Sequence, residues 1–242
     1  MQPTFVLVPG SHAAGRCFTA LQRELALRGH RSLAVDLPGH GTAGFSTAYQ
    51  TQDLAAFADE PSPTAGITHA DNVAHVAETV RRVRKHGPVI LVGHSRGGFV
   101  VTSVANAVPD LLARTVYVSA WCCVTGTAAD YLATPAFRSP DTGAEIVASR
   151  SALDPNESRD AGTDVVDLAT WGGIPHSYVR LTADASVPLA LQDHFIEEAD
   201  ALTPGNPFDV HSLPVGHIDS LLQPTDLAEI LAGTADYREG AR

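Results

Sequence analysis

Three residues whose types can together carry out nucleophilic catalysis, Ser95, Asp184 and His217, each follow a predicted β-strand. A serine hydroxyl is a weak nucleophile until a base removes its proton. A histidine can be that base near neutral pH, and a carboxylate holds the imidazole in the required tautomer and stabilises its protonated form. The three residue types therefore predict acyl transfer through a covalent intermediate on Ser95.

Ser95 lies in a G-x-S-x-G pattern, Gly93-His94-Ser95-Arg96-Gly97. An apolar run at 89–92 precedes this pattern and an apolar stretch of helical composition follows it, so we expect a strand, a very sharp turn and a helix. Glycine suits both flanking positions because the strand and helix backbones approach closely in such a turn. The alternative interpretation is a tight turn that carries an inert serine.

Asp184 and His217 come directly after two later predicted strands, at 178–182 and 207–213. In an open parallel sheet the reactive site lies beyond the carboxyl ends of the strands, so we expect these side chains to meet Ser95. His217 could instead be an ordinary loop histidine. Three other carboxylates are rivals of Asp184. Asp193 and Asp200 lie farther along the predicted helix that follows Asp184. Asp219 lies two residues after His217, where an acid favours the start of a helix or turn.

Acyl transfer also needs hydrogen-bond donors for the developing oxyanion. We expect one to be the backbone N–H of Arg96, which follows the nucleophile. The other is the backbone N–H of Ser11 or of its neighbour, because Gly10 allows the first loop to turn its amides inward.

Three further residues are candidates for lining the substrate pocket: His12, His94 and Trp121. His94 flanks the nucleophile and could instead be structural. The Arg96 side chain either forms a salt bridge on its helix or binds a substrate carboxylate.

Alternation of apolar runs and amphipathic segments predicts an α/β fold, a mostly parallel six-stranded sheet with helices on both faces. The expected strands are 4–8, 32–35, 89–92, 115–119, 178–182 and 207–213, and the expected helices are 17–28, 69–85, the segment after Ser95 to 107, 188–199 and 224–232. Residues 1–242 form a single predicted domain with two additions. One is a surface excursion over about 42–67, with a helical turn near 53–58. The other is a cap over about 120–176, with short helices near 128–132, 144–149 and 165–170.

The composition of the 242 residues limits the partners that the chain can have. A net charge of −11 argues against non-specific binding to nucleic acid or to an anionic membrane. The first residues have no basic region and no long apolar run, so we predict no signal peptide, and no stretch is long enough for a membrane span. Three cysteines, two of them adjacent, suggest neither a disulfide framework nor a metal site, so we expect a reducing, cytoplasmic setting. A homodimer is left open.

Five segments together resemble the α/β-hydrolase superfamily, in particular the small-cap plant methyl esterases, the hydroxynitrile lyases and their bacterial relatives. They are Phe5-Val6-Leu7-Val8-Pro9-Gly10-Ser11, Asp36-Leu37-Pro38-Gly39-His40-Gly41, the elbow Leu91–Gly98, Thr182-Ala183-Asp184 and Gly216-His217. The similarity spans nearly the whole chain and is weakest across 42–67 and 124–176. The resemblance implies a hydrolase core, hydrolysis of the carboxylic ester of a small, largely apolar molecule, or of a lactone, and no cofactor.

The sequence departs from this family pattern at three positions. Pro9 replaces a histidine that is frequent in the first loop, and Arg96 stands where an apolar or aromatic residue is usual. Ile218 stands where the hydroxynitrile lyases carry a lysine, which disfavours lyase chemistry. Two alternatives stay open: the same triad applied to lyase or C–C bond cleavage, or a ligand-binding protein on a hydrolase scaffold.

Overall fold

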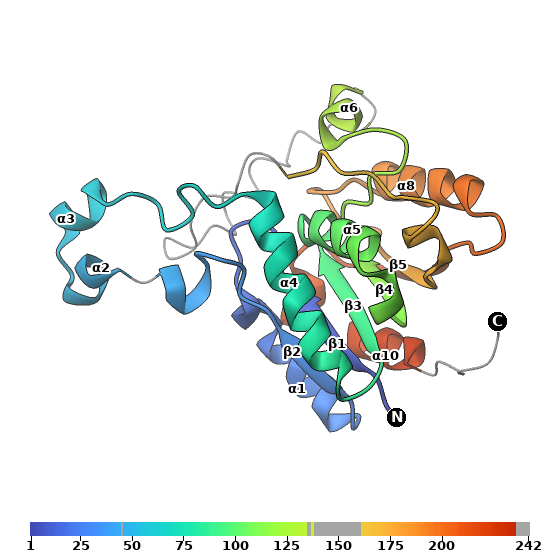
Figure 1. Ribbon diagram of the computed structural model, residues 1–242, viewed down its shortest axis with the longest axis horizontal. Helices are drawn as coiled ribbons and strands as arrows, with labels where there is room; N and C mark the ends of the chain where they lie inside the picture. The colour runs from blue at the N-terminus through green and yellow to red at the C-terminus, as the bar shows by residue number, and fades with distance from the viewer. Residues whose placement is uncertain (45, 135–136, 138–160, 236–242) are drawn as a thin grey trace.

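The computed structural model describes residues 1–44, 46–134, 137 and 161–235. Six strands form one fully parallel sheet in the order β2-β1-β3-β4-β5-β6 (Figure 1). Their bounds lie within about two residues of the predicted strands: β1 (Thr4–Val8), β2 (Arg31–Ala34), β3 (Val89–His94), β4 (Arg114–Val118), β5 (His176–Leu181) and β6 (Asp209–Leu213). The predicted α/β class and the parallel sheet are confirmed.

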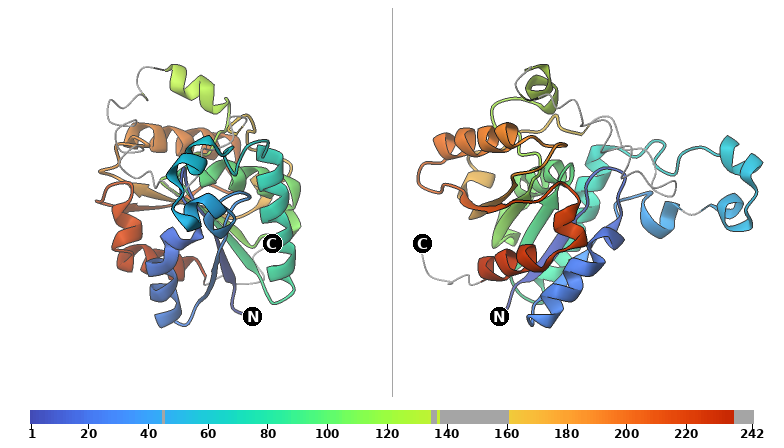
Figure 2. Two further views of the ribbon diagram at one scale, coloured as in Figure 1. Left: turned by 90° about the vertical axis from the view of Figure 1, so that its left-hand side faces the viewer. Right: turned by 180° about the vertical axis from the view of Figure 1, so that it is seen from behind.

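Helices cover both faces of the sheet, as the continuous apolar runs of its strands require (Figure 2). Along β1, Phe5 and Leu7 join the core under one helix layer, whereas Val6 and Val8 join the core on the opposite face. The first layer comprises α1 (Thr19–Leu27), α9 (Asp219–Leu222) and α10 (Thr225–Thr234). The second comprises α4 (His69–Arg84), α5 (Gly97–Ala107) and α8 (Leu189–Leu202).

The segment after β2 projects from the body of the molecule (Figure 1). It contains the short 3-10 helix η2 (Gly41–Gly44), then α2 (Thr47–Thr51) and α3 (Leu54–Asp59). The helical turn predicted near 53–58 is α3, whereas α2 was not predicted. Tyr49 and Phe57 pack their rings together, with centroids 5.9 Å apart.

The connection between β4 and β5 contains α6 (Ala128–Ala133), which confirms the helix predicted at 128–132. The predicted helix at 144–149 lies outside the described residues. The helix predicted at 165–170 is wrong, because the backbone there bonds to other parts of the fold. The Val166 amide donates to the Cys123 carbonyl, and the Asp167 amide to the Asn106 side chain. A 3-10 turn, η5 (Trp171–Gly173), follows.

Hydrogen bonds to Glu198 of α8 hold the cap helix α6 and the segment before it against α8. The Tyr131 hydroxyl donates to this carboxylate, and the Thr125 hydroxyl donates to its second oxygen at 2.5 Å. In return the Tyr131 oxygen accepts the amides of Val124 and Thr125. Among the described residues, no helix has the length and apolarity to cross a membrane.

Candidate active site

Ser95 occupies the tip of the turn between β3 and α5 with φ at +54°, a strained conformation for a residue with a side chain. Close contacts with a side chain at Gly93 and with the backbone at Gly97 explain the two glycines. A Cβ on Gly93 would lie 2.7 Å from a methyl of Val101, and a Cβ on Gly97 would lie 2.5 Å from the Val8 carbonyl oxygen. Both positions therefore exclude any larger residue, and the predicted elbow geometry is present.

His217 and Asp184 meet at the carboxyl edge of the sheet, 33 residues apart in sequence. His217 Nδ1 donates to Asp184 Oδ2 at 2.6 Å, and both residues are buried. The same Oδ2 accepts the Ser119 hydroxyl, while Oδ1 accepts the amides of Ser186 at 2.7 Å and Val187 at 2.9 Å. The carboxylate is thus held by four donors.

These donors set the charge of Asp184. Burial alone would raise the pKa of this carboxyl, but the hydrogen bonds from His217, Ser119 and the Val187 amide outweigh burial and lower the pKa. The group therefore stays ionised and can orient the imidazole of His217 and stabilise its protonated form.

Ser119 is a member of the site that sequence reasoning missed. It follows β4 directly, is fully buried and has φ at +39°. Because β4 and β5 are neighbouring strands, the residue after β4 lies beside the loop that carries Asp184. A small polar residue at that strand end was the available signal.

His94 precedes Ser95 at the end of β3 and holds the His217 segment against this central strand. Its Nε2 donates to the His217 carbonyl oxygen at 3.0 Å, and the two ring centroids lie 4.5 Å apart. Burial, reinforced by the charge of the neighbouring His217, lowers the pKa of His94 to about 3. His94 is therefore neutral at ordinary pH, and its hydrogen bond positions His217 while its ring also lines the cavity beside Ser95.

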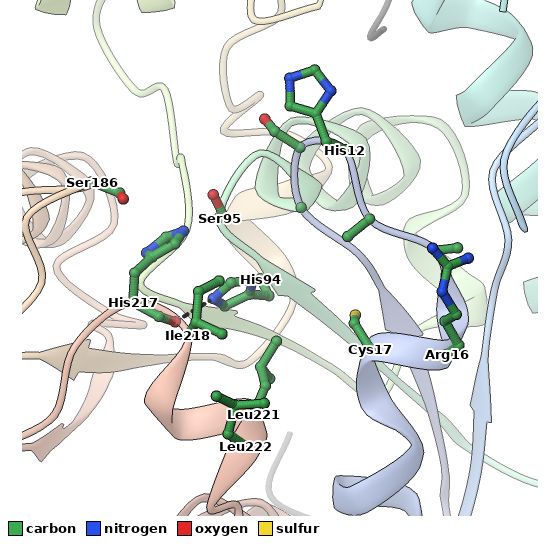
Figure 3. A pocket seen from close by; sticks show the side chains of 14 residues that line it. His12, Arg16, Cys17, His94, Ser95, Ser186, His217, Ile218, Leu221 and Leu222 are labelled. Atoms are coloured by element: carbon green, nitrogen blue, oxygen red, sulfur yellow. Dashed lines mark hydrogen bonds between the residues drawn. The ribbon is translucent and has the colours of Figure 1, made fainter. Parts of the chain in front are cut away.

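A cavity of about 430 Å³ opens beside Ser95, a size suited to a small organic molecule. Figure 3 shows Ser95 and His217 on one side of it and Arg16 and Cys17 on the other. Its surface is mostly apolar, and the described lining residues are Gly10, Ser11, His12, Ala13, Ala14, Arg16, Cys17, His94, Ser95, Ser186, His217, Ile218, Leu221 and Leu222.

The lining agrees with part of the prediction. His12 and His94 contribute to it, but Trp121 does not. Trp121 packs between Phe99 and Phe195, with ring centroids 5.4 and 5.7 Å away, because its apolar ring completes the core beneath the cap. The described lining comes from the first loop, the elbow, Ser186 after β5 and the segment around α9, and it includes no described residue of the cap or of the excursion.

The loop after β1 passes directly against the elbow. A Cβ on Gly10 would lie 2.8 Å from the Ser95 Cβ, so the Ser11 amide lies in the immediate surroundings of the nucleophile. Arg96 caps α5, where the helix dipole favours negative charge. The Arg96 guanidinium lies 5.8 Å from the Phe99 ring centroid and outside the described lining of the cavity, which disfavours a role in binding a substrate carboxylate.

The arrangement places a strained serine and a buried histidine at one largely apolar cavity, with an ionised carboxylate bonded to the histidine. Such a set can activate a hydroxyl for attack on a carbonyl group. Within the described ranges no group of three or more histidine, cysteine or acidic side chains could hold a metal ion.

Comparison with known proteins supports the fold. Residues 5–230 match the model of the alpha/beta hydrolase family. The chain is 26% identical to a pyrethroid hydrolase from Sphingobium wenxiniae, over 98% of this chain and 90% of that protein. The solved structure of polyneuridine aldehyde esterase aligns with a TM-score of 0.72 at 19% identity, over 98% of this chain and all of that one. A methylesterase from Arabidopsis aligns with a TM-score of 0.68 at 19% identity, over 96% and 98% of the two chains. With the family model spanning nearly the whole sequence, the chain belongs to the α/β-hydrolase family.

Proposed function

We propose that the protein is a serine hydrolase that cleaves the carboxylic ester of a small, largely apolar molecule. The observation that carries this proposal is the His217–Asp184 pair, 2.6 Å apart, at the same cavity as the strained Ser95. The names of the similar proteins, a pyrethroid hydrolase, an esterase and a methylesterase, support ester hydrolysis.

In the proposed reaction His217 Nε2 removes the Ser95 proton while the hydroxyl attacks the ester carbonyl. The amides of Ser11 and Arg96 stabilise the oxyanion, and each such donor contributes about 3–4 kcal/mol to the transition state. His217 then protonates the leaving alcohol. Water, activated by the same base, releases the acid and restores Ser95.

Lyase chemistry is less well supported, because Ile218 adds an apolar side chain to the cavity beside the base. A cation at this position would be needed to stabilise a departing anion such as cyanide. A ligand-binding role would leave the strain at Ser95 and the buried charge at Asp184 without a purpose.

The test is covalent labelling with a fluorophosphonate, followed by peptide mapping, alongside turnover of 4-nitrophenyl acetate. We expect a single adduct on Ser95 and loss of both label and turnover in Ser95→Ala. Ser212→Ala is the matched control, since this hydroxyl on β6 accepts hydrogen bonds from Arg180 on β5. Full turnover in Ser95→Ala would refute the proposal.

A further inference from the structure

Among the described residues that line the cavity beside Ser95, one side chain carries a permanent charge, and that charge is positive. Among its described lining residues, Arg16 is the only lysine, arginine, aspartate or glutamate. Figure 3 shows Arg16 across the cavity from Ser95 and His217. Apolar surface from Ile218 and Leu221 contributes to the wall of the same cavity.

The backbone that carries Arg16 is held firmly. The Gly15 amide donates to Asp36 Oδ1 at 2.7 Å, and the Cys17 amide donates to the Ala14 carbonyl at 2.9 Å. The Arg16 carbonyl accepts the Thr19 hydroxyl at 2.8 Å. The backbone of Arg16 is therefore fixed at the cavity, which limits the ordering that a bound ligand requires.

We propose that the preferred substrates are esters that carry a second acid group, which Arg16 binds while Ser95 attacks the ester carbonyl. This inference rests on the proposed ester hydrolysis and names its substrate class. A guanidinium presents a planar set of donors that matches a carboxylate with two parallel hydrogen bonds. The apolar surface between Ser95 and Arg16 suits a hydrocarbon spacer. Monoesters of dicarboxylic acids carry an ester for Ser95, an acid for Arg16 and such a spacer between them.

The charge of the whole protein works against this preference. With a net charge of −11, the long-range field repels an anion, so a preference for acidic esters requires a local cation. Because Arg16 is exposed, water and salt weaken its ion pair, and we expect a preference of roughly fivefold to tenfold in kcat/KM.

The test uses monomethyl esters of straight-chain dicarboxylic acids, from succinate to sebacate, each paired with the neutral ester in which a primary amide replaces the free acid. A second set places the acid on the alcohol side, as in acetate esters of ω-hydroxy acids and their amides. For each pair the ratio of kcat/KM is measured in the wild type, Arg16→Gln and Arg16→Lys. Arg23→Gln is the control, because this α1 arginine is 71% exposed and lies beside Glu24.

We expect the acid to be preferred at one spacer length, on either the acyl or the alcohol side. Arg16→Gln should lower kcat/KM for the acids more than for the neutral amides and so abolish the preference. Arg16→Lys should keep part of the preference, and Arg23→Gln should keep all of it. The preference should fall as salt is raised, because the ion pair is screened. Comparing the acid-to-amide ratio of kcat/KM between the wild type and Arg16→Gln cancels the contribution of the electrostatic field of the rest of the protein.

Equal kcat/KM for acid and amide throughout both sets would overturn the inference, as would an unchanged preference in Arg16→Gln. Neither result would affect the proposed function, which fails if Ser95 takes no label or if Ser95→Ala keeps full turnover. The two failures are therefore distinguishable.

Discussion

Replacement of Asp184 by asparagine tests the proposed triad, because it exchanges one carboxylate oxygen for an NH₂ group and leaves the shape of the side chain almost unchanged. The carboxylate accepts two backbone amides on Oδ1 and two side-chain donors on Oδ2. Asparagine has only one acceptor oxygen. If its NH₂ group replaced Oδ1, it would face the amides of Ser186 and Val187, and both of these buried donors would lose their partner. The oxygen must therefore take the Oδ1 position.

This orientation directs the NH₂ group at His217 Nδ1 and at the Ser119 hydroxyl. To accept this hydrogen bond, His217 must move its proton to Nε2, the atom that should receive the Ser95 proton. The imidazole is then present in the wrong tautomer, while its position hardly changes.

We expect Asp184→Asn to lower kcat by roughly 10³- to 10⁴-fold with little change in KM, because comparable triads lose about 10⁴-fold. At about 1.36 kcal/mol per tenfold, this is a loss of roughly 4–5.5 kcal/mol of transition-state stabilisation. The rate of fluorophosphonate labelling at Ser95 should fall in parallel.

Steady-state kinetics with 4-nitrophenyl acetate measures the rate, and ¹⁵N NMR of the histidine rings identifies the tautomer of His217. Asp193→Asn is the matched control, because this carboxylate pairs with Arg180 at 2.7 Å near the surface. Activity within tenfold of the wild type, or a proton still on Nδ1 in Asp184→Asn, would refute the reasoning.

The other predictions concern the supports of the site. Ser119→Ala removes one of four donors to the triad carboxylate and should lower kcat about tenfold, measured with the same ester, with circular dichroism unchanged. Gly98→Ala places a Cβ 2.0 Å from the Trp121 carbonyl oxygen, so urea titration should show that the free energy of unfolding falls by at least about 1–3 kcal/mol. The control is Gly173→Ala, whose Cβ meets no atom within 4 Å and which should keep the stability of the wild type. The pKa of His94 is about 3 in the folded protein and 6.5 in the unfolded chain. Between pH 3 and pH 6.5 the unfolded state therefore binds a proton at His94 that the folded state does not. Stability should therefore fall as pH drops below 6.5, by about 2 kcal/mol at pH 5, and His94→Gln should remove that share of the pH dependence in urea titrations.

The sequence predicted the sheet well, and it placed the three triad candidates at strand ends, because both inferences depend on local patterns. Continuous apolar runs identify strands buried on two faces, and the rule for parallel sheets selects the residues that follow them. Ser95, Asp184 and His217 needed no more than this rule and their order in the chain.

The features that were missed depend on contacts between distant segments. Ser119 acquires its role only because β4 lies next to β5. Trp121 is an aromatic residue of the kind expected in an apolar pocket, yet its half-buried ring packs between Phe99 and Phe195 against the core. At 165–170 the tertiary hydrogen bonds to Cys123 and Asn106 overrode helix propensity. The position of Arg16 at the cavity likewise depends on how the first loop folds back on Asp36.

The place of β6 at the edge of the sheet links catalysis to local unfolding. β6 pairs only with β5, and most of its residues are at least partly exposed, yet the loop that follows it carries His217. Elements with few buried contacts open at a lower free-energy cost than the whole fold. Detachment of this strand would separate His217, the proposed base, from Ser95, which would remain on central β3. Enzyme activity should therefore disappear at lower urea concentrations than circular dichroism does, and the amides of β6 should exchange with deuterium before those of β3.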